Sequence, residues 1–419
     1  MPKHFHARFQ PARRVAEAAL ALCLLTAGGS AIARDVFPPT GPDVLQTPTL
    51  TMLDPEFNRD KKLLTWVDVV SGDIWVASYD YTTGNFIPAN GQGTLIEAGV
   101  STGGQYPGLG FTINGPEWAQ GTPTDYIVYT RTNATTGDPT PANALIGVAY
   151  QNPDSTWTRK SLSTPQRNGP YGSISRNGAA KISYQDAFGS HYVRTLTDAN
   201  SEVPLPLLTK TGLTPVARFV DNANVVVYQG AINGVAQSVA YNIDSAVLTQ
   251  LTFDATPKDQ SWMWSAPEFD GALGLVNITG RSTITMYAPV VDGNGATTYQ
   301  VYGTATAPKG GTWFSLEPFA YQGRTYMLAQ LQPRGASFPT SIWMAAFGPR
   351  GAILRQLTPD GVSAEARADA EFLPISTGVL IVYSKFDTTK CTPDNVSNWL
   401  CMQGLMGLYR ADTGLPAPH

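Results

Sequence analysis

Two stretches in distant parts of the chain share the letters Pro-Glu-Phe: residues 264–280 read "WSAPEFDGALGLVNITG" and residues 53–66 read "LDPEFNRDKKLLTW". In both, the shared letters precede a polar turn and a run of apolar and β-branched residues. A short run of this kind between turn residues is typical of a β-strand. The repetition therefore predicts a structural unit that occurs more than once.

Seven such units can be aligned on the residue that ends the shared letters. Each contains a first strand ending near this marker, a polar turn and further short strands, the last of which often ends in Leu-Thr. Four strands in about fifty residues are the signature of a propeller blade. The markers are Phe57, Trp118, Ile174, Phe219, Phe269, Phe319 and Phe372.

The two ends of the chain complement each other. The seventh unit stops after its third strand, at residues 407–414, while residues 44–47 form one strand too many before the first marker. An N-terminal strand that completes the last blade would close the ring. We therefore predict an all-β, seven-bladed β-propeller over residues 44–419. Because the third unit has a weak marker, Ile174, and no Glu, six blades with an insertion are the alternative.

Composition agrees with a repetitive β structure. Charged residues make up 14% of the chain, against roughly 25% in typical soluble proteins, so Thr, Ser, Asn, Gln and Gly must fill much of the surface. The 40 Gly and 32 Pro residues disfavour helices, and no long pattern of helical period follows the N-terminal segment.

Residues 1–33 have the pattern of a signal peptide. A basic start precedes the apolar stretch at residues 18–27, and Ala31 and Ala33 form a small-x-small cleavage site. The apolar stretch is shorter than the roughly 20 residues that span a bilayer, and no other segment is a candidate span. We therefore expect a periplasmic or secreted protein, with residues 34–43 as a linker. Export leaves Cys391 and Cys401, which we expect to form a disulfide in an oxidising compartment.

Charge and residue counts exclude several function classes. The net charge is −4, and the chain has no Lys/Arg cluster, which argues against nucleic acid or an anionic membrane as a partner. After export only His191 and His419 remain, too few for a zinc site or a Ser-His-Asp triad. No Walker A, GxGxxG or EF-hand pattern is present. We expect a monomer that uses no cofactor and no metal.

The order of elements in each unit resembles a known family. Pro-x-aromatic, polar turn, apolar strand, second strand and Leu-Thr is similar to the repeat of the TolB-like propellers of exported bacterial proteins, which are related to WD40 blades. The resemblance covers the whole mature chain. The usual Ser-Pro-Asp-Gly turn of that family is replaced here, for example by "NRDKK" and "FDGA". The resemblance therefore implies the fold and not the cellular role of TolB.

Acidic residues recur beside the markers and form the first candidate site. Side chains alternate along a strand, so a residue next to a packed aromatic points the other way, towards the channel or the neighbouring blade. One interpretation is a ring of carboxylates that binds a ligand, and the other is a set of hydrogen-bonded contacts between blades. The candidates are Glu56, Glu117, Glu268, Glu317 and Glu371, with Arg218 in the same place in the fourth unit.

Aromatic residues form the second part of the candidate site. Trp262, Trp264 and Trp313 come just before predicted first strands, and Trp399 lies between the two cysteines. Exposed aromatic side chains stack on sugar rings or anchor protein partners. The alternative is that they pack between blades.

The sequence thus favours an exported binding module for a glycan or a cell-envelope protein, acting through an aromatic, acid-rimmed loop face. The alternative is a polysaccharide-degrading enzyme, a lyase or a glycoside hydrolase, that uses two channel-mouth carboxylates. No set of catalytic residues is recognisable, so we assign none and lean away from an enzyme.

Overall fold

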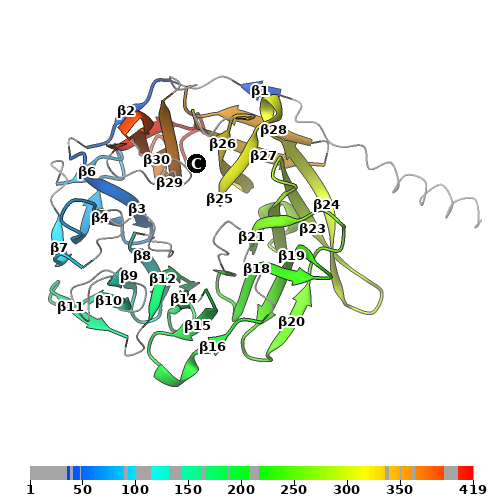
Figure 1. Ribbon diagram of the computed structural model, residues 1–419, viewed down its shortest axis with the longest axis horizontal. Coiled ribbons are helices and arrows are strands. Elements are labelled where there is room, and N and C mark those ends of the chain that lie inside the picture. The colour runs from blue at the N-terminus through cyan, green and yellow to red at the C-terminus, as the bar shows by residue number, and fades with distance from the viewer. Residues whose placement is uncertain are drawn as a thin grey trace, which may run out of the picture.

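A computed structural model describes residues 35–37, 41–47, 49–88, 93–100, 115–131, 144–162, 166–186, 189–206, 217–335, 339–349, 351–359, 364–390 and 404–418. Residues 1–33, Trp399 and the pair Cys391 and Cys401 lie outside this part of the chain. Seven mainly antiparallel sheets surround a central axis (Figure 1). The predicted all-β, seven-bladed propeller is confirmed. No helix in the described ranges has the length and apolar character needed to cross a membrane.

The first three blades follow one another along the chain. Blade 1 contains β3 (Met52–Asn58), β4 (Leu63–Asp68), β5 (Ile74–Tyr79), β6 (Phe86–Ile87) and β7 (Thr94–Glu97). Blade 2 contains β8 (Glu117–Gly121), β9 (Tyr126–Arg131), β10 (Leu145–Gln151) and β11 (Trp157–Ser161). Blade 3 contains β12 (Arg167–Gly172), β14 (Lys181–Asp186), β15 (His191–Thr195) and β16 (Val203–Pro204), while β13 (Ile174–Ser175) pairs with β8.

The other four blades have the same order. Blade 4 contains β17 (Arg218–Phe219), β18 (Val225–Ile232), β19 (Val235–Asn242) and β20 (Val247–Gln250), and blade 5 contains β21 (Lys258–Ser265), β22 (Leu273–Thr279), β23 (Thr283–Val291) and β24 (Thr297–Thr306). Blade 6 contains β25 (Thr312–Tyr321), β26 (Arg324–Gln332), β27 (Ser341–Gly348) and β28 (Gly351–Gln356). Blade 7 contains β29 (Glu365–Ile375), β30 (Gly378–Asp387), β31 (Leu405–Asp412) and the N-terminal β2 (Val44–Leu45).

The N-terminal segment closes the ring as predicted. β2 runs antiparallel to β31, with Val44 opposite Arg410 and Leu45 opposite Tyr409, so the start of the propeller supplies the outer strand of its last blade. Just upstream, β1 (Asp35–Phe37) runs parallel to β28 of blade 6 (Figure 1). The edges of two successive blades are therefore covered by one short stretch of chain.

A buried ionic cluster holds this closure in place. The carboxylate of Asp43, immediately before β2, accepts hydrogen bonds from Nζ of Lys385 at 2.9 Å and from Nε of Arg367 at 3.1 Å. The Tyr383 hydroxyl also donates to Asp43. Because Arg367 is only 1% exposed and Asp43 6% exposed, removal of one partner would leave the other charged and buried.

The inner strands of five blades share a bulge. The pairing with the second strand shifts just before Glu56, Tyr171, Trp262, Glu317 and Glu371. A residue with positive φ lies in each bulge, and these residues are Asp54, Gly169, Gln260, Ser315 and Asp369. Bulges re-aim the side chains that follow them, so the same position of each blade is presented to the axis.

The marker aromatics of several inner strands pack between blades. Phe57 lies in one apolar cluster with Leu373 and Val382 of blade 7. Phe319 and Phe372, from blades 6 and 7, stack with their ring centroids 4.6 Å apart. Full burial of a Phe side chain stabilises a fold by about 1.5–3 kcal/mol, so these contacts join each blade to the next.

Candidate axial binding site

One side chain from each blade occupies an equivalent position on the inner strand. In blades 2 and 4 this position is the first residue of the inner strand that pairs with the second strand: Glu117 lies opposite Val128, and Arg218 lies opposite Val227. In the other five blades it is the residue directly after the bulge. We call these seven residues the axial ring: Glu56, Glu117, Tyr171, Arg218, Trp262, Glu317 and Glu371. The strands that carry them border the central opening in Figure 1.

Electrostatic contacts show that the ring residues converge. Arg218 of blade 4 interacts with Glu56 of blade 1, Glu117 of blade 2 and Glu317 of blade 6. Glu56 in turn interacts with Glu117 and with Glu371 of blade 7. Groups from five blades can be mutual neighbours only at the axis, so the predicted acidic positions meet in one site, with one exception described below.

Arg218 is held between two aromatic rings. Its guanidinium lies 4.0 Å from the centroid of a Trp262 ring and 4.7 Å from that of Tyr171. Its Nη2 is also 3.4 Å from Oε1 of Glu317, two blades away. Cation–π contacts of this kind contribute about 0.5–2 kcal/mol each, with the larger values in desolvated sites. The stacking face of Trp262 is therefore occupied by a residue of the same chain.

Arg59 anchors the opposite side of the ring. It lies in the turn after β3, and its Nη2 is 2.7 Å from Oε2 of Glu371. Its Nε donates to the carbonyl of Phe372 at 3.0 Å, and its guanidinium lies 3.6 Å from the centroid of the Phe372 ring. Arg59 thus orients Glu371 and connects blade 1 with blade 7.

Asp54 and Asp369 form a second level of acidic groups, two positions before Glu56 and Glu371 respectively. Their carboxyl groups are hydrogen-bonded to each other, and the Gly115 amide also donates to Asp54. Burial raises the pKa of Asp369 well above its usual range, and the neighbouring Asp54 carboxylate adds to this effect. Two interacting carboxyl groups that are both buried favour a state in which one of them is protonated.

The glutamates of the ring also favour the protonated state. Burial raises the pKa of Glu117 to about 8; Glu371 and Glu317 add to this shift, while Arg218 opposes it. Burial likewise raises the pKa of Glu56 and of Glu317 well above the usual range. Six carboxyl groups and two guanidinium groups meet here within the described residues, so the axial site has an excess of acid. No three Asp, Glu, His or Cys side chains in the described ranges are arranged to hold a metal ion.

Glu268 lies apart from the axial ring, contrary to our alignment of the repeats. The inner strand of blade 5 ends at Ser265, and the repeated Pro-Glu-Phe forms the short helix η4 (Pro267–Phe269). Pro267 suits the first helical position and Asp270 follows with a φ of 52°. The Glu268 carboxylate accepts hydrogen bonds from the amide and the hydroxyl of Thr325 in blade 6. Glu268 therefore makes a hydrogen-bonded contact between blades, which was the second of the two interpretations of the repeated acidic residue.

Two of the predicted aromatic residues are buried rather than placed on a loop face. Trp264 lies in β21 and Trp313 in β25, and both belong to the apolar cluster between blades 5 and 6. The indole Nε1 of Trp264 donates to Thr325 Oγ1 at 3.0 Å, and that of Trp313 donates to the Ala305 carbonyl at 3.1 Å. We expected both residues in the loops before these strands, but the strands begin earlier and include them. Both side chains therefore pack between blades, as the alternative interpretation stated.

Four residues of the site were not among the predicted ones: Arg59, Asp54, Asp369 and Tyr171. A signal for the aspartates was present, because "DPEF" at residues 54–57 and "DAEF" at residues 369–372 share Asp two positions before Glu. For Tyr171 the marker of the third unit misled us, since Ile174 lies in β13 and pairs with blade 2. His191 begins the third strand of its blade, and burial lowers its pKa to about 4.

Comparison with solved structures finds distant similarity to other proteins. The β-propeller domain of Cps50 (Swd1) from Myceliophteria thermophila is 10% identical, and the similarity covers 88% of this chain and 99% of that chain with a TM-score of 0.51. A protein from Lactobacillus plantarum is 14% identical, with 74% and 85% of the two chains covered and a TM-score of 0.42. TolB from Acinetobacter baumannii is 13% identical, with 82% and 77% covered and a TM-score of 0.35. No family model and no curated protein matches the sequence.

Proposed function

We propose that this protein is an exported binding module that takes a cationic group of a cell-envelope protein into its axial site. The β-propeller is commonly a binding scaffold. The observation that carries the proposal is the imbalance at the axis, where Asp54, Asp369 and four ring glutamates face two cationic groups among the described residues, Arg59 and Arg218. A Lys or Arg side chain of a partner would neutralise this excess and form charge-assisted hydrogen bonds.

The geometry favours a basic protein segment over a glycan at this site. Sugar recognition needs an open aromatic face, but the face of Trp262 is covered by Arg218, and Trp264 and Trp313 are buried. The side chains of Glu317 and Glu371 are 17% and 8% exposed, respectively. These groups can be reached by a long, thin side chain that enters along the axis.

Calorimetric titration with oligo-lysine and with oligo-glutamate tests the proposal. We expect binding of the basic peptide only, weakened at least tenfold in Glu117→Gln and in Glu371→Gln. Glu268→Gln is the matched control, since Glu268 lies between blades 5 and 6 and its substitution should leave the affinity unchanged. Equal binding of both peptides, or an affinity that is the same in Glu117→Gln and in the wild type, would contradict the proposal.

Export and the TolB-like relationship are part of the proposal. They are supported by the signal pattern of residues 1–33, by the low content of charged residues and by the repeat pattern of the blades. The mature N-terminus and the state of Cys391 and Cys401 can be read by mass spectrometry of the unreduced protein from cell fractions. A chain that keeps residues 1–33 in the cytoplasm would contradict export.

A second candidate function is polysaccharide cleavage at the same axis. It is favoured by one observation: Glu117, with a pKa of about 8, holds a proton at neutral pH and interacts with Glu371, where burial raises the pKa and Arg59 opposes that rise. One protonated and one ionised carboxyl group can act as acid and base or nucleophile in glycoside cleavage. Incubation with polysaccharides would then yield reducing ends or unsaturated products, and Glu117→Gln would abolish them.

A further inference from the structure

Two separate strands, β6 and β7, pair with the third strand of blade 1 on its outer side. β6 pairs with Ser78 and Tyr79 of β5, and β7 pairs with residues 74–76 of the same strand. Ala77, between them, has no partner on either outer strand. Within the described residues each of the other six blades has one outer strand of its own. We call the space beside these two strands, on the side of blade 1 that faces blade 2, the notch.

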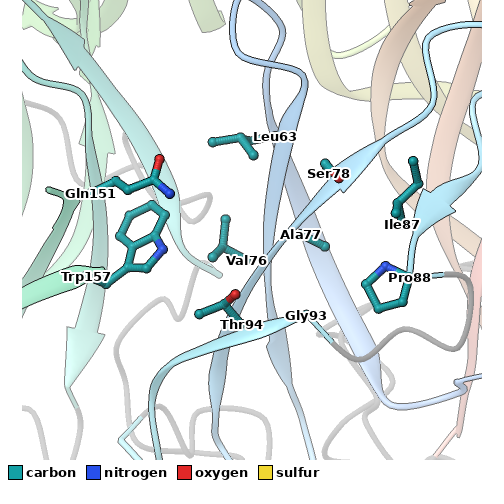
Figure 2. Close-up of a pocket in the computed structure, with 10 residues that line it drawn as sticks. All are labelled: Leu63, Val76, Ala77, Ser78, Ile87, Pro88, Gly93, Thr94, Gln151 and Trp157. Atoms are coloured by element: carbon teal, nitrogen blue, oxygen red, sulfur yellow. The ribbon is translucent and has the colours of Figure 1, made fainter. Parts of the chain in front are cut away.

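A pocket of about 390 Å³ occupies the notch. Leu63, Val76 and Ser78 of blade 1 form one side of it, and Thr94 lies at its edge (Figure 2). The opposite side consists of Gln151 and Trp157 of blade 2. These two residues are cross-strand partners in β10 and β11, so their side chains project from the same face of the sheet.

The chemistry of the pocket is neutral and mixed. Its ten lining residues include no Asp, Glu, Lys, Arg or His, so an ionic ligand would lose its hydration without gaining a counter-charge. The indole of Trp157 and the side chains of Leu63 and Val76 supply apolar contact, while the Gln151 amide and the Thr94 and Ser78 hydroxyls can donate and accept hydrogen bonds. The amide nitrogen of Gln151 makes one long hydrogen bond, 3.4 Å to the Ser155 carbonyl, that a ligand can replace.

This combination matches a pyranose ring. A neutral sugar has a C–H face that stacks on an indole and a rim of hydroxyls that bond to amides and hydroxyls. We propose that the notch is a second binding site, separate from the axis, for a neutral hexopyranose unit of a glycan. Trp157 stacks on the sugar, and Gln151 and Thr94 bond to its hydroxyls. The proposal rests on blades 1 and 2 alone and does not depend on the axial carboxyl groups.

Titration with neutral oligosaccharides of glucose, mannose and N-acetylglucosamine, and with acidic oligogalacturonate, tests the proposal by tryptophan fluorescence and calorimetry. We expect binding of at least one neutral series and not of oligogalacturonate. Trp157→Ala should weaken it at least tenfold, and Gln151→Ala at least threefold. Since Trp157 also packs on the apolar cluster beneath it, Trp157→Phe, which keeps a stacking ring, should fold and bind with intermediate affinity.

Two controls make the result specific. Phe253 is 73% exposed and lies outside the notch, so Phe253→Ala should bind as the wild type does. Glu117→Gln should also bind neutral sugars normally, even if it loses oligo-lysine. The proposal is overturned if the wild type binds no neutral oligosaccharide. It is equally overturned if Trp157→Phe and Gln151→Ala both bind as tightly as the wild type, or if Glu117→Gln alone loses the sugar.

Discussion

Glu268 accepts two hydrogen bonds from Thr325, one from its amide and one from its hydroxyl at 2.7 Å. The same hydroxyl oxygen accepts from the indole of Trp264 at 3.0 Å, and Thr325 is fully buried. A chain of polar contacts therefore runs from the inner strand of blade 5 through its helical turn to the second strand of blade 6.

Loss of this contact should lower stability without affecting binding. Glu268→Ala leaves the Thr325 amide and hydroxyl without their acceptor, and a buried unsatisfied group costs about 1–3 kcal/mol. We expect the free energy of unfolding in urea to fall by about 2–3 kcal/mol, while oligo-lysine binds as before. Glu268→Gln, which keeps one acceptor oxygen, should lose less. A variant of unchanged stability that no longer binds the peptide would place Glu268 in the binding site.

The axial carboxyl groups predict that stability falls as pH rises. Since the pKa of Glu117 is about 8 and those of Glu56 and Glu317 are also raised, the folded state binds more protons than the unfolded state between about pH 4.5 and 8. Their contribution is fully present below the unfolded pKa of about 4.5 and is lost as pH rises through the folded pKa values. The Tm should therefore decrease across this range, as calorimetry at several pH values can measure.

Glu117→Gln separates this effect from the rest of the protein. The amide resembles the protonated carboxyl group and does not titrate, so the decrease in Tm between pH 5 and 8 should become smaller. Asp60→Asn, at an exposed position, should leave the pH profile as it is. An unchanged profile in Glu117→Gln would mean that Glu117 is ionised in the folded protein at neutral pH.

Binding of a cation at the axis should depend on pH in the opposite direction. Because a bound ammonium or guanidinium group lowers the pKa of its carboxylate partners, binding releases protons. We expect the affinity for oligo-lysine to increase from pH 5 to pH 8. Titrations in buffers of different ionisation enthalpy would measure the protons released, and a value of zero would contradict protonation of the empty site.

Arg218 acts as an internal competitor for such a ligand. Arg218→Gln removes a cation from among the ring carboxylates, so the affinity for oligo-lysine should rise several-fold. The same change removes two cation–π contacts and an ion pair with Glu317, so the free energy of unfolding should fall by about 2–4 kcal/mol. A weaker affinity in Arg218→Gln would show that Arg218 supports the bound ligand instead.

Closure of the ring should depend strongly on Asp43. Asp43→Ala removes one of the two carboxylates that pair with the buried Arg367 and Lys385 and leaves Glu365 as the other; breaking a buried pair costs about 3–5 kcal/mol. Asp60 and Arg176 form an ion pair that is more than half exposed on both sides, so Asp60→Ala should cost at most about 1 kcal/mol. Urea denaturation of both variants measures the difference, and equal losses would contradict a role for burial.

The seven blades were predictable because each leaves a local signal in the sequence, short strands separated by turns. The closing strand was predictable because the last unit is one strand short and the N-terminal segment has one strand too many. The position of each side chain around the axis was harder to predict. In blade 1, Pro55-Glu56-Phe57 lies in the inner strand, whereas in blade 5 the same letters form a turn after it. The three letters alone do not show whether they lie in the strand or after it. In blade 5 the pairing register of the inner strand is set upstream of them, by the bulge between Asp259 and Trp262.

The contact between Asp54 and Asp369 could not be predicted from the sequence for a different reason. These residues are separated by nearly the whole propeller, and their hydrogen bond exists only because blade 7 is brought back against blade 1. Their sequence context, Asp two positions before Glu, was visible in both units. That the two carboxyl groups meet follows from the circular closure and from the bulges that hold both residues at positive φ.

Closure of the ring by β2 also has a consequence for the order in which the protein can be made. Asp43 and Tyr383 are in contact although 340 positions separate them, so β2, which is synthesised early, has to wait for the last blade. Until then the edge of the first segment stays unpaired, and contacts of such long sequence separation form slowly. Nascent chains of this protein should therefore remain sensitive to protease until synthesis is complete, and become resistant in a single late step.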